Sequence, residues 1–307
     1  MERRTFLRRM LAAAAVVLGL DRLSLFDLIP KAAAASPSHS LLVTGTDRDY
    51  ARLVTEIMKA LGGMERFVRT GSRVVVKPNI SWDRRPEFGA NTQPLVVKRV
   101  VELCLEAGAG EVTVMDRPCN DERRCYRESG VQAAVESIGS SRARIRHLNR
   151  RRFVTKDLPR GVALKRWDFY GDALEADTLI IVPPAKQHGS ARLSLGMKNV
   201  MGLVGGRRER LHVGSLHQHI ADLNTVLRAH LTIIDATHLL VANGPSGGSL
   251  EDVRILNRVA ASADPVAADS YAATLFGLRG EDIGYVRYGH QLGFGEMDLN
   301  KVKVVET

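Results

Sequence analysis

Short apolar runs alternate with amphipathic segments along most of the chain. Runs rich in β-branched residues predict strands at residues 40–43, 73–76, 111–115, 144–148, 178–182, 231–235, 255–260 and 301–305. Apolar residues at helical spacing predict helices at residues 48–61, 94–107, 127–138, 193–201, 216–229 and 266–276. Strands that alternate with helices in this way are typical of β–α–β units, in which helices cover parallel strands. We therefore expect an α/β fold with mainly parallel sheets flanked by helices.

The predicted elements fall into two groups, separated by an irregular basic stretch at residues 142–166. We therefore expect two α/β lobes, residues 36–165 and residues 166–307, with a cleft between them. No internal repeat or low-complexity linker marks the boundary, so the basic stretch alone places it.

The first 35 residues have the pattern of an export signal. Arg3-Arg4-Thr-Phe-Leu is followed by an apolar run at residues 11–20 and by four alanines that end at Ala35. The run is shorter than the roughly 20 apolar residues of a membrane-spanning helix, so we predict a cleaved signal; an uncleaved amphipathic N-terminus is the alternative. The paired arginines resemble the signal that the twin-arginine translocase reads. This resemblance implies that a folded protein is exported to the periplasm or another extracytoplasmic compartment, with membrane contact only through the signal.

The chain carries a formal net charge of +10 and stays basic without its first 35 residues. The basic stretch at residues 142–166 has the charge to meet an anionic lipid, a cell-wall polymer or an anionic substrate, and a solvated face is the simpler interpretation. Only 5% of the residues are aromatic and no nucleic-acid-binding motif is present, which argues against a nucleic-acid partner.

The three cysteines limit the cofactors that the chain can hold. An iron–sulfur cluster takes four cysteine ligands, so a count of three argues against one. Cys104 lies on the apolar face of the helix predicted at residues 94–107 and is expected in the core. Cys119 and Cys125 share a polar loop, and their spacing is compatible with a local disulfide, a soft-metal site or two free thiols.

Polar residues gather where predicted strands end, which is where open parallel sheets bind ligands. Lys77 and Asn79 follow the strand at residues 73–76. A lysine at the mouth of an apolar strand needs an anionic partner or solvent to stay charged, so we predict that both residues bind a ligand. Asn91 precedes the next helix and joins this group, whereas Thr92 is expected to be the N-cap of that helix.

A second polar group follows the strand at residues 178–182 and contains Lys186, His188, Lys198 and Asn199. Together with the glycine-rich segment that ends at Arg208, these residues have the positive charge and the N–H groups to hold a carboxylate or a phosphate. The segment matches neither the phosphate-binding loop nor the dinucleotide glycine fingerprint. A flexible basic surface loop is the alternative interpretation.

Histidines are concentrated between His188 and His219. In a helix over residues 216–229, His217 and His219 would point to opposite flanks, and no H-E-x-x-H spacing is present, which argues against a closed zinc site. His188 and His212 are candidates for a metal site built from separate loops, or for a general base near neutral pH.

A third polar group contains Asp235, Asn243 and Asp269. Asp235 ends a predicted strand and Asp269 lies in the last predicted helix, so both are candidate hydrogen-bond acceptors or ligands of a hard cation. Asn243 begins an Asn-Gly-Pro-Ser-Gly-Gly segment that is typical of a turn. Asp264 and Pro265 fit the N-cap and the first position of the last predicted helix.

Taken in order, these motifs resemble those of the family catalogued as domain of unknown function 362. The resemblance covers residues 35–307 as one family domain and rests on Lys77-Pro-Asn79, Asn91-Thr-Gln-Pro94, Lys186 with His188, Ser194-Leu-Gly-Met-Lys198-Asn199-Val-Met-Gly202, His212, Asp235, Asn243-Gly-Pro245 with Gly247, and Asp264-Pro-Val-Ala267 with Asp269. Some members carry ferredoxin-type cysteine motifs and are described as iron–sulfur proteins, and this chain lacks those motifs. The layout of polar loops on two α/β lobes also resembles the nickel-containing lactate racemase family at the level of fold.

We therefore expect an exported enzyme whose cleft binds a small anionic substrate, with a metal or a small organic cofactor as a further component. In this hypothesis the anion is held by Lys77, Lys186 and Lys198. Asn79 and Asn199 orient the anion, and either His188 or His212 moves a proton. The alternative is a non-catalytic cell-envelope protein that binds a solute, a metal or a cell-wall polymer.

Overall fold

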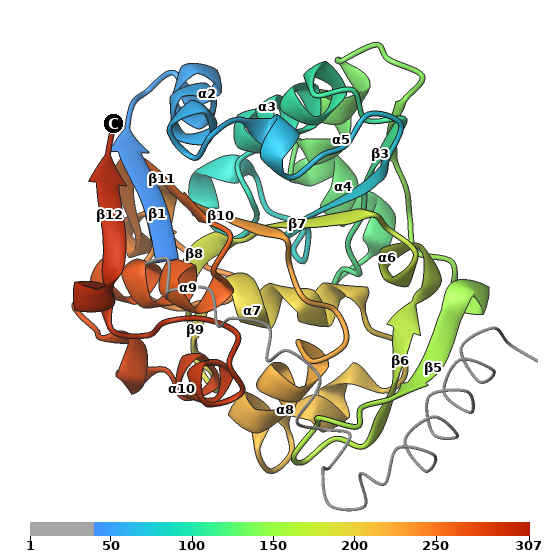
Figure 1. The fold of residues 1–307 in the computed structure, drawn as a ribbon, viewed down its shortest axis with the longest axis vertical. Helices are drawn as coiled ribbons and strands as arrows, with labels where there is room; N and C mark the ends of the chain where they lie inside the picture. The colour runs from blue at the N-terminus through green and yellow to red at the C-terminus, as the bar shows by residue number, and fades with distance from the viewer. Residues whose placement is uncertain (1–39) are drawn as a thin grey trace, which may run out of the picture. The chain divides into compact units, whose positions relative to one another are not determined.

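The computed structural model describes residues 40–307, so the export signal predicted at residues 1–35 lies outside the described residues. The strands of the main sheet are β1 (Ser40–Thr46), β2 (Arg73–Pro78), β3 (Glu111–Val114), β4 (Ala143–Ile145), β7 (Thr178–Val182), β8 (Pro184–His188), β9 (Arg192–Ser194), β10 (Leu231–Leu240), β11 (Val253–Ser262) and β12 (Val302–Glu306). They form a ten-stranded sheet in the order β12-β1-β11-β10-β7-β2-β3-β4, with β8 and β9 attached beside β10 (Figure 1).

The sheet is mainly parallel, as the alternating pattern predicted. Along the main order, β11 runs against both of its neighbours, β1 and β10. The pairs β1–β12, β7–β10, β2–β7, β2–β3 and β3–β4 are parallel. The carboxyl ends of the parallel strands therefore lie at the same edge of the sheet.

Helices cover both faces of the sheet (Figure 1). One face packs against α2 (Tyr50–Ala60), α3 (Pro94–Glu106), α4 (Glu122–Glu128) and α5 (Val131–Glu136). The other face packs against α6 (Gly171–Leu174), α7 (Gly196–Asn199), α8 (Leu216–Leu223), α9 (Pro265–Thr274) and α10 (Gly284–Gln291). Alternate side chains of each strand enter the two cores: in β2, Val74 and Val76 lie in the first and Val75 in the second. Burial of both faces explains why central strands such as β7 are apolar on both sides.

The two halves of the chain share this sheet and differ in the face that their helices cover. The expected lobe boundary at residue 165 lies between β5 (Phe153–Asp157) and β6 (Arg166–Tyr170), which pair as a separate two-stranded sheet. On either side of this point, β2 and β7 are neighbours in the main sheet. The described residues 40–307 form one compact unit. A cut at residue 165 would therefore pass through two sheets.

Three predicted helices differ from the observed ones. The helix predicted at residues 193–201 is β9 followed by the short α7, because the N–H groups of Gly196 and Met197 donate to Asp269 and a helix starts there. The helix predicted at residues 127–138 is broken at Gly130, whose φ of 72° ends α4 and precedes α5. The helix predicted at residues 216–229 ends at Leu223. Sequence patterns also did not predict β5, β6, β8 and α10.

Helix α9 begins as the sequence indicated. The Asp264 side chain accepts hydrogen bonds from the N–H groups of Val266 and Ala267, and Pro265 occupies the first helical position. Among the helices of residues 40–307, none has both the length and the apolar composition needed to span a bilayer.

Candidate functional site

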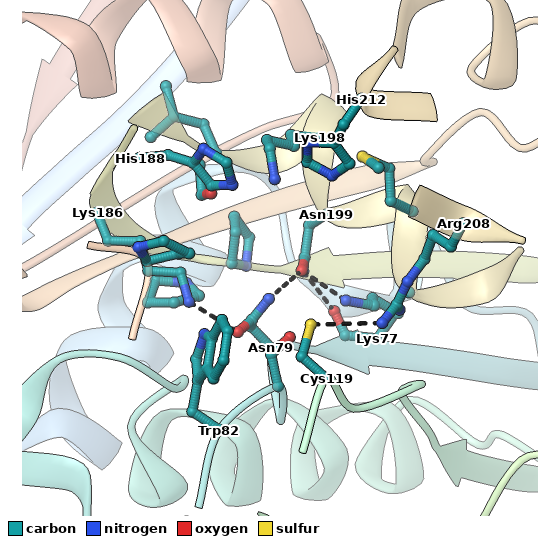
Figure 2. A pocket seen from close by; sticks show the side chains of 18 residues that line it. Lys77, Asn79, Trp82, Cys119, Lys186, His188, Lys198, Asn199, Arg208 and His212 are labelled. Atoms are coloured by element: carbon teal, nitrogen blue, oxygen red, sulfur yellow. Dashed lines mark hydrogen bonds between the residues drawn. The ribbon is translucent and has the colours of Figure 1, made fainter. Parts of the chain in front are cut away.

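A cavity of about 270 Å³ lies where β2 and β7 end (Figure 2). From β2 the chain continues to β3 and β4 on one side, and from β7 it continues to β10 on the other side. The strand order therefore reverses between β2 and β7, and the connecting helices lie on opposite faces. Open parallel sheets bind ligands in the crevice that such a reversal leaves.

Seven of the predicted site residues come together in this cavity. They are Lys77, Asn79, Lys186, His188, Lys198, Asn199 and His212. Four others do not line it: Asn91, Asp235, Asn243 and Asp269. The lining also includes Trp82, Cys119 and Arg208.

Lys77 finds its anionic partner in Asp116. Lys77 Nζ lies 2.9 Å from Asp116 Oδ1, and both side chains are almost completely buried. The second oxygen, Asp116 Oδ2, accepts the N–H of Ile80 at 2.6 Å. Burial lowers the pKa of Lys77, and the carboxylate of Asp116 opposes that shift. A Cβ at Gly202 would collide with Asp116 Oδ1 and Lys77 Cε, so the pair requires glycine there.

Sequence reasoning missed Asp116, although a signal for it was present. Asp116 lies two residues after β3, and Lys77 lies at the end of the neighbouring β2. A lysine and an aspartate at the ends of consecutive apolar strands meet at the same edge of a parallel sheet. The prediction that Lys77 needs a partner was therefore correct, and its strand neighbour supplies that partner.

Two asparagines connect the lysines to one another (Figure 2). Asn199 Oδ1 accepts from Lys77 Nζ at 2.5 Å and from Asn79 Nδ2 at 3.1 Å. Asn199 Nδ2 donates to the Lys77 carbonyl at 3.2 Å. Asn79 Oδ1 accepts from Lys186 Nζ at 3.0 Å, and Lys186 also donates to the carbonyl of Ala90. The network fixes both amide orientations, since each oxygen faces an ammonium group.

Lys186 is a buried cation and Lys198 a partly buried one, and neither has a nearby carboxylate. Within residues 40–307, no Asp or Glu oxygen lies within 4 Å of either Nζ. Burial and the neighbouring Lys198 lower the pKa of Lys186 to about 7. Burial lowers the pKa of Lys198 to about 8, and the positive charges of Arg208 and Lys77 add to that shift. Each lysine would be charged more readily with an anion in the cavity.

Arg208 adds a fourth cationic side chain to the cavity wall. It begins the 3₁₀ turn Arg208–His212 and donates to the carbonyls of Arg117 at 2.7 Å and Pro118 at 3.0 Å. Its Nη2 also lies 3.4 Å from Cys119 Sγ. These bonds hold the guanidinium in place, so its charge acts on the cavity from a fixed position.

His188 is held as a neutral hydrogen-bond donor. Its Nδ1 accepts the N–H groups of Ser190 and Ala191, each at 3.2 Å, which places the ring proton on Nε2. Burial and the positive charge of Lys198 lower the pKa of His188 to about 3. A histidine that accepts two backbone N–H groups at Nδ1 and lies beside a lysine is a weak base near neutral pH. Its Nε2–H is available to donate to a ligand.

His212 lies beside His188 on the more open side of the cavity. The two rings stack with centroids 5.9 Å apart, and Ser190 Oγ lies between them, 3.4 Å from Nδ1 of His188 and 3.3 Å from Nδ1 of His212. Desolvation and Lys198 lower the pKa of His212 as well, although the residue as a whole is exposed. Of the two histidines, His212 has the better access for proton exchange with solvent.

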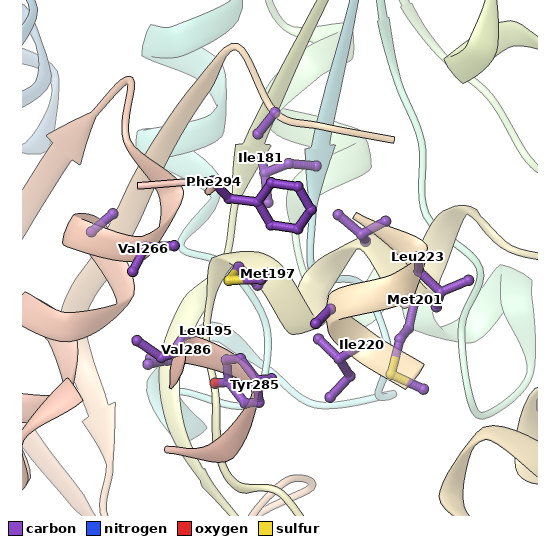
Figure 3. Packing of buried hydrophobic residues seen from close by; sticks show 14 of the residues in the cluster. Ile181, Leu195, Met197, Met201, Ile220, Leu223, Val266, Tyr285, Val286 and Phe294 are labelled. Carbon is purple, nitrogen blue, oxygen red and sulfur yellow. The ribbon is translucent and has the colours of Figure 1, made fainter. Parts of the chain in front are cut away.

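Asp269 acts on the cavity indirectly, through α7. Its two oxygens accept the N–H groups of Gly196 at 2.7 Å and Met197 at 2.9 Å, the first residues of this helix. Met197 packs in the apolar cluster between α9 and α8 (Figure 3). Burial raises the pKa of Asp269 to about 7. Since Lys198 and Asn199 follow directly in α7, Asp269 is a positioning residue and not a cation ligand.

The other predicted ligand residues also bind protein groups. Asn91 exchanges hydrogen bonds with the backbone of Trp82 and so holds the loop after β2. Asp235 accepts the N–H of Gln93, the N-cap residue of α3, at 2.7 Å. Asn243 donates to both oxygens of Asp252 at 3.0 Å. The predicted N-cap Thr92 instead bonds the Asn79 N–H and the Val182 carbonyl, which ties β2 to β7.

The three cysteines are free thiols in the structure, so the candidate disulfide between Cys119 and Cys125 is not formed. Cys119 is exposed at the cavity, whereas Cys125 is buried, with its Sγ 3.5 Å from the Ser81 carbonyl. Cys104 is buried in the core, as expected from its helical face. Among residues 40–307, no three His, Cys, Asp or Glu side chains are grouped to hold a metal ion.

The family model described as "Domain of unknown function (DUF362)" matches residues 74–274, and this segment contains every residue that lines the cavity. The thylakoid-associated protein sll1697 of Synechocystis sp. (strain ATCC 27184 / PCC 6803 / Kazusa) is 28% identical over 221 residues. That match covers 69% of this chain, and the chain spans 65% of the length of the relative.

Two solved structures match this chain over part of their length. The lactate racemase apoprotein of Thermoanaerobacterium thermosaccharolyticum matches with a TM-score of 0.49 and 11% identity, over 76% of this chain and 56% of that one. A Thermotoga maritima protein matches with a TM-score of 0.46 and 13% identity, over 74% of this chain and 59% of that one.

Proposed function

Because the chain belongs to the family defined by domain of unknown function 362, whose description names no reaction, we propose from the cavity itself that the protein is an enzyme acting on a small anionic compound. The observation that carries this proposal is the pair Lys186 and Lys198. Both are cations that lie at the ligand-binding edge of a parallel sheet, Lys186 buried and Lys198 partly buried, and neither has a carboxylate within 4 Å in the described part of the chain. A buried cation is costly without a counterion, and a bound anion would supply one.

The side chains that line the cavity carry a net positive charge, which favours binding of an anion. Lys77 is neutralised by Asp116, so it serves mainly to orient Asn199. Lys186, Lys198 and Arg208 are left without a neutralising side chain among residues 40–307. A cavity of about 270 Å³ accommodates a small metabolite and not a polymer.

The polar groups around the lysines support catalysis over simple retention. His188 presents a neutral Nε2–H that would donate to an oxygen on which negative charge develops. His212, on the open side, would carry protons between the ligand and solvent. This assignment divides the roles of the two histidines: His188 donates a hydrogen bond, and His212 moves the proton.

A metal ion is a poorer occupant of this cavity than an organic anion. The side chains that line it are cationic or neutral, and Asp116, the carboxylate behind Lys77, is already paired with that lysine. Cations repel a metal ion, and hard cations bind to oxygen ligands. Native mass spectrometry with elemental analysis of the protein purified from its own cells tests this point, and a stoichiometric metal would contradict it.

We propose in addition that the protein is exported by the twin-arginine pathway to an extracytoplasmic compartment. The proposal is supported by Arg3-Arg4, the apolar run at residues 11–20 and the alanines before residue 36. The Synechocystis relative bears a name that associates it with the thylakoid. Replacing both Arg3 and Arg4 by lysine should keep the protein in the cytoplasm, and cell fractionation with mass spectrometry of the mature N-terminus would show whether it does.

The anion proposal is tested by calorimetric titration of the mature protein with phosphate, acetate, lactate and pyruvate at pH 7. We expect at least one of these anions to bind, and we expect Lys186→Met to weaken its binding at least tenfold. Lys303→Met removes an exposed lysine of β12 and serves as the matched control. If none of the anions binds, the proposal is wrong. An anion that binds to a protein free of turnover would favour the non-catalytic binding protein instead.

A further inference from the structure

Lys198 differs from the other two lysines of the cavity in having no partner. Lys77 Nζ binds Asp116 and Asn199, and Lys186 Nζ binds Asn79 and the carbonyl of Ala90. Within residues 40–307, Lys198 Nζ makes neither a hydrogen bond within 3.5 Å nor an ion pair. The residue lines the cavity and is partly exposed to it, so its amine is free to meet a ligand.

The surroundings of Lys198 raise the fraction of its amine that is neutral near physiological pH. Burial and the positive charges of Arg208 and Lys77 lower its pKa to about 8. At pH 7.5 such a lysine has roughly 200 times more free amine than an exposed lysine with the usual pKa of 10.5. A lysine amine that neighbouring cations hold neutral is a nucleophile towards carbonyl groups.

The neighbours of Lys198 suit a carbonyl compound that also carries a carboxylate. Figure 2 shows Lys198 beside His188 and His212, and its charge acts on both histidines. The His188 Nε2–H would donate to the carbonyl oxygen, and Lys186 would bind the carboxylate. The cations alone would be sufficient to bind an anion. A free amine next to a neutral N–H donor is suited in addition to react with a carbonyl group.

We propose that Lys198 forms an imine with the carbonyl carbon of a small oxo acid bound in this cavity. The inference rests on the proposed function, since the oxo acid is the small anion. The lone pair of Lys198 Nζ forms a bond to the carbonyl carbon, and the electron pair of the C=O bond moves to the oxygen. A proton passes from nitrogen to oxygen, and the carbinolamine then loses water to give the imine. Hydrolysis reverses the step, so it requires neither an oxidant nor a reductant.

The imine defines the class of reaction that the site would perform. A protonated imine draws electrons from the adjacent carbon, which eases the loss of a proton or of carbon dioxide from that carbon. His212 is placed to exchange such a proton with solvent. Proton exchange, decarboxylation or carbon–carbon bond cleavage next to a carbonyl group all follow from this chemistry.

Trapping with sodium borohydride tests the inference. The mature protein is incubated with pyruvate, reduced and digested, and the modified peptide is identified by mass spectrometry. We expect a stable adduct on Lys198, no adduct with lactate, and no adduct on the exposed Lys303 under the same conditions. The rate of trapping at saturating pyruvate should rise as the pH approaches 8 and level off above it.

Lys198→Arg separates imine formation from anion binding, because arginine keeps the charge and forms no imine. We expect this variant to give no adduct even at pyruvate concentrations that calorimetry shows to saturate it, because the guanidinium stays charged. An adduct on Lys186, or no adduct on a protein that binds pyruvate, overturns the role of Lys198 and leaves the anion site standing. If neither pyruvate nor any other anion binds, the proposed function fails as well.

Discussion

Replacing Lys198 by methionine should make the folded protein more stable while it weakens anion binding. Methionine is unbranched and of similar length, so it can occupy the same space in the wall of the cavity. Lys198 donates no hydrogen bond in the described part of the structure, so the change leaves no acceptor unpaired. The variant therefore removes the cost of a buried charge and little else.

The size of the gain follows from the pKa of Lys198. Folding lowers this pKa from 10.5 to about 8, and at pH 7 a shift of this size corresponds to about 3 kcal/mol of lost stability. Because the side chain is partly exposed to the cavity, water reduces this cost, and we expect the free energy of unfolding to rise by about 2 kcal/mol in Lys198→Met.

The gain in stability of Lys198→Met over the parent protein should decrease as the pH rises. Below pH 8 the lysine is protonated in the folded and the unfolded state, so the folded state bears the full cost of the charge. Between pH 8 and 10.5 the unfolded state binds more protons than the folded state, so the parent protein becomes relatively more stable as the pH rises. The advantage of Lys198→Met should therefore be largest at pH 7 and disappear near pH 10.5.

Urea unfolding at pH 7 and at pH 9.5 measures this difference, with Lys303→Met as the control for loss of an exposed lysine. Added phosphate or pyruvate should stabilise the parent protein and the control, and should stabilise Lys198→Met much less. A variant that is equally stable or less stable than the parent at pH 7 would refute the reasoning, because Lys198 would then have an unrecognised favourable partner.

Three further outcomes follow from the site. Gly202→Ala should lower the free energy of unfolding by about 3 kcal/mol, because the new methyl group collides with the Lys77–Asp116 pair. The matched control is Gly248→Ala, where a Cβ meets no atom within 4 Å. Equal urea midpoints for the two variants would contradict the expectation. Anion affinity measured by calorimetry should fall between pH 7 and pH 9.5 as Lys186 and Lys198 lose their protons, whereas exposed lysines would hold it to above pH 10. The ring resonances of His188 should stay constant in NMR spectra from pH 5 to pH 8, since its pKa is about 3; a titration near pH 6.5 would show that the ring is not held neutral.

The cavity residues could be predicted from the sequence because strand ends are local features. An apolar run that stops at Lys77 or Val182 predicts where a strand ends, and the next polar residues then lie at the edge of the sheet. Which strands are neighbours depends on pairing between distant segments. Asp116 was missed for this reason, although it is an ordinary polar residue after an apolar run.

Asp235 and Asp269 were predicted as hydrogen-bond acceptors or as ligands of a hard cation, and the sequence did not distinguish these two roles. In the structure Asp269 accepts N–H groups 73 and 72 positions away in the chain, and Asp235 accepts one 142 positions away. Such a carboxylate accepts hydrogen bonds from the free N–H groups at the start of a helix that is distant in sequence. No local pattern therefore distinguishes it from an acid that binds a ligand. By contrast, Asp264 caps its own helix and was predicted correctly.

The placement of β1 has a consequence for the order in which the protein acquires its structure. Residues 40–44 of β1 pair with residues 302–306 of β12 on one side, and β11 pairs on the other side. The partners of this early strand are therefore made more than 200 residues after it, and pairings between such distant segments form slowly. Until β11 and β12 have been made, β1 lacks its native partners and has the open edges of an aggregation-prone strand. During this interval β1 is the segment that a chaperone would need to cover.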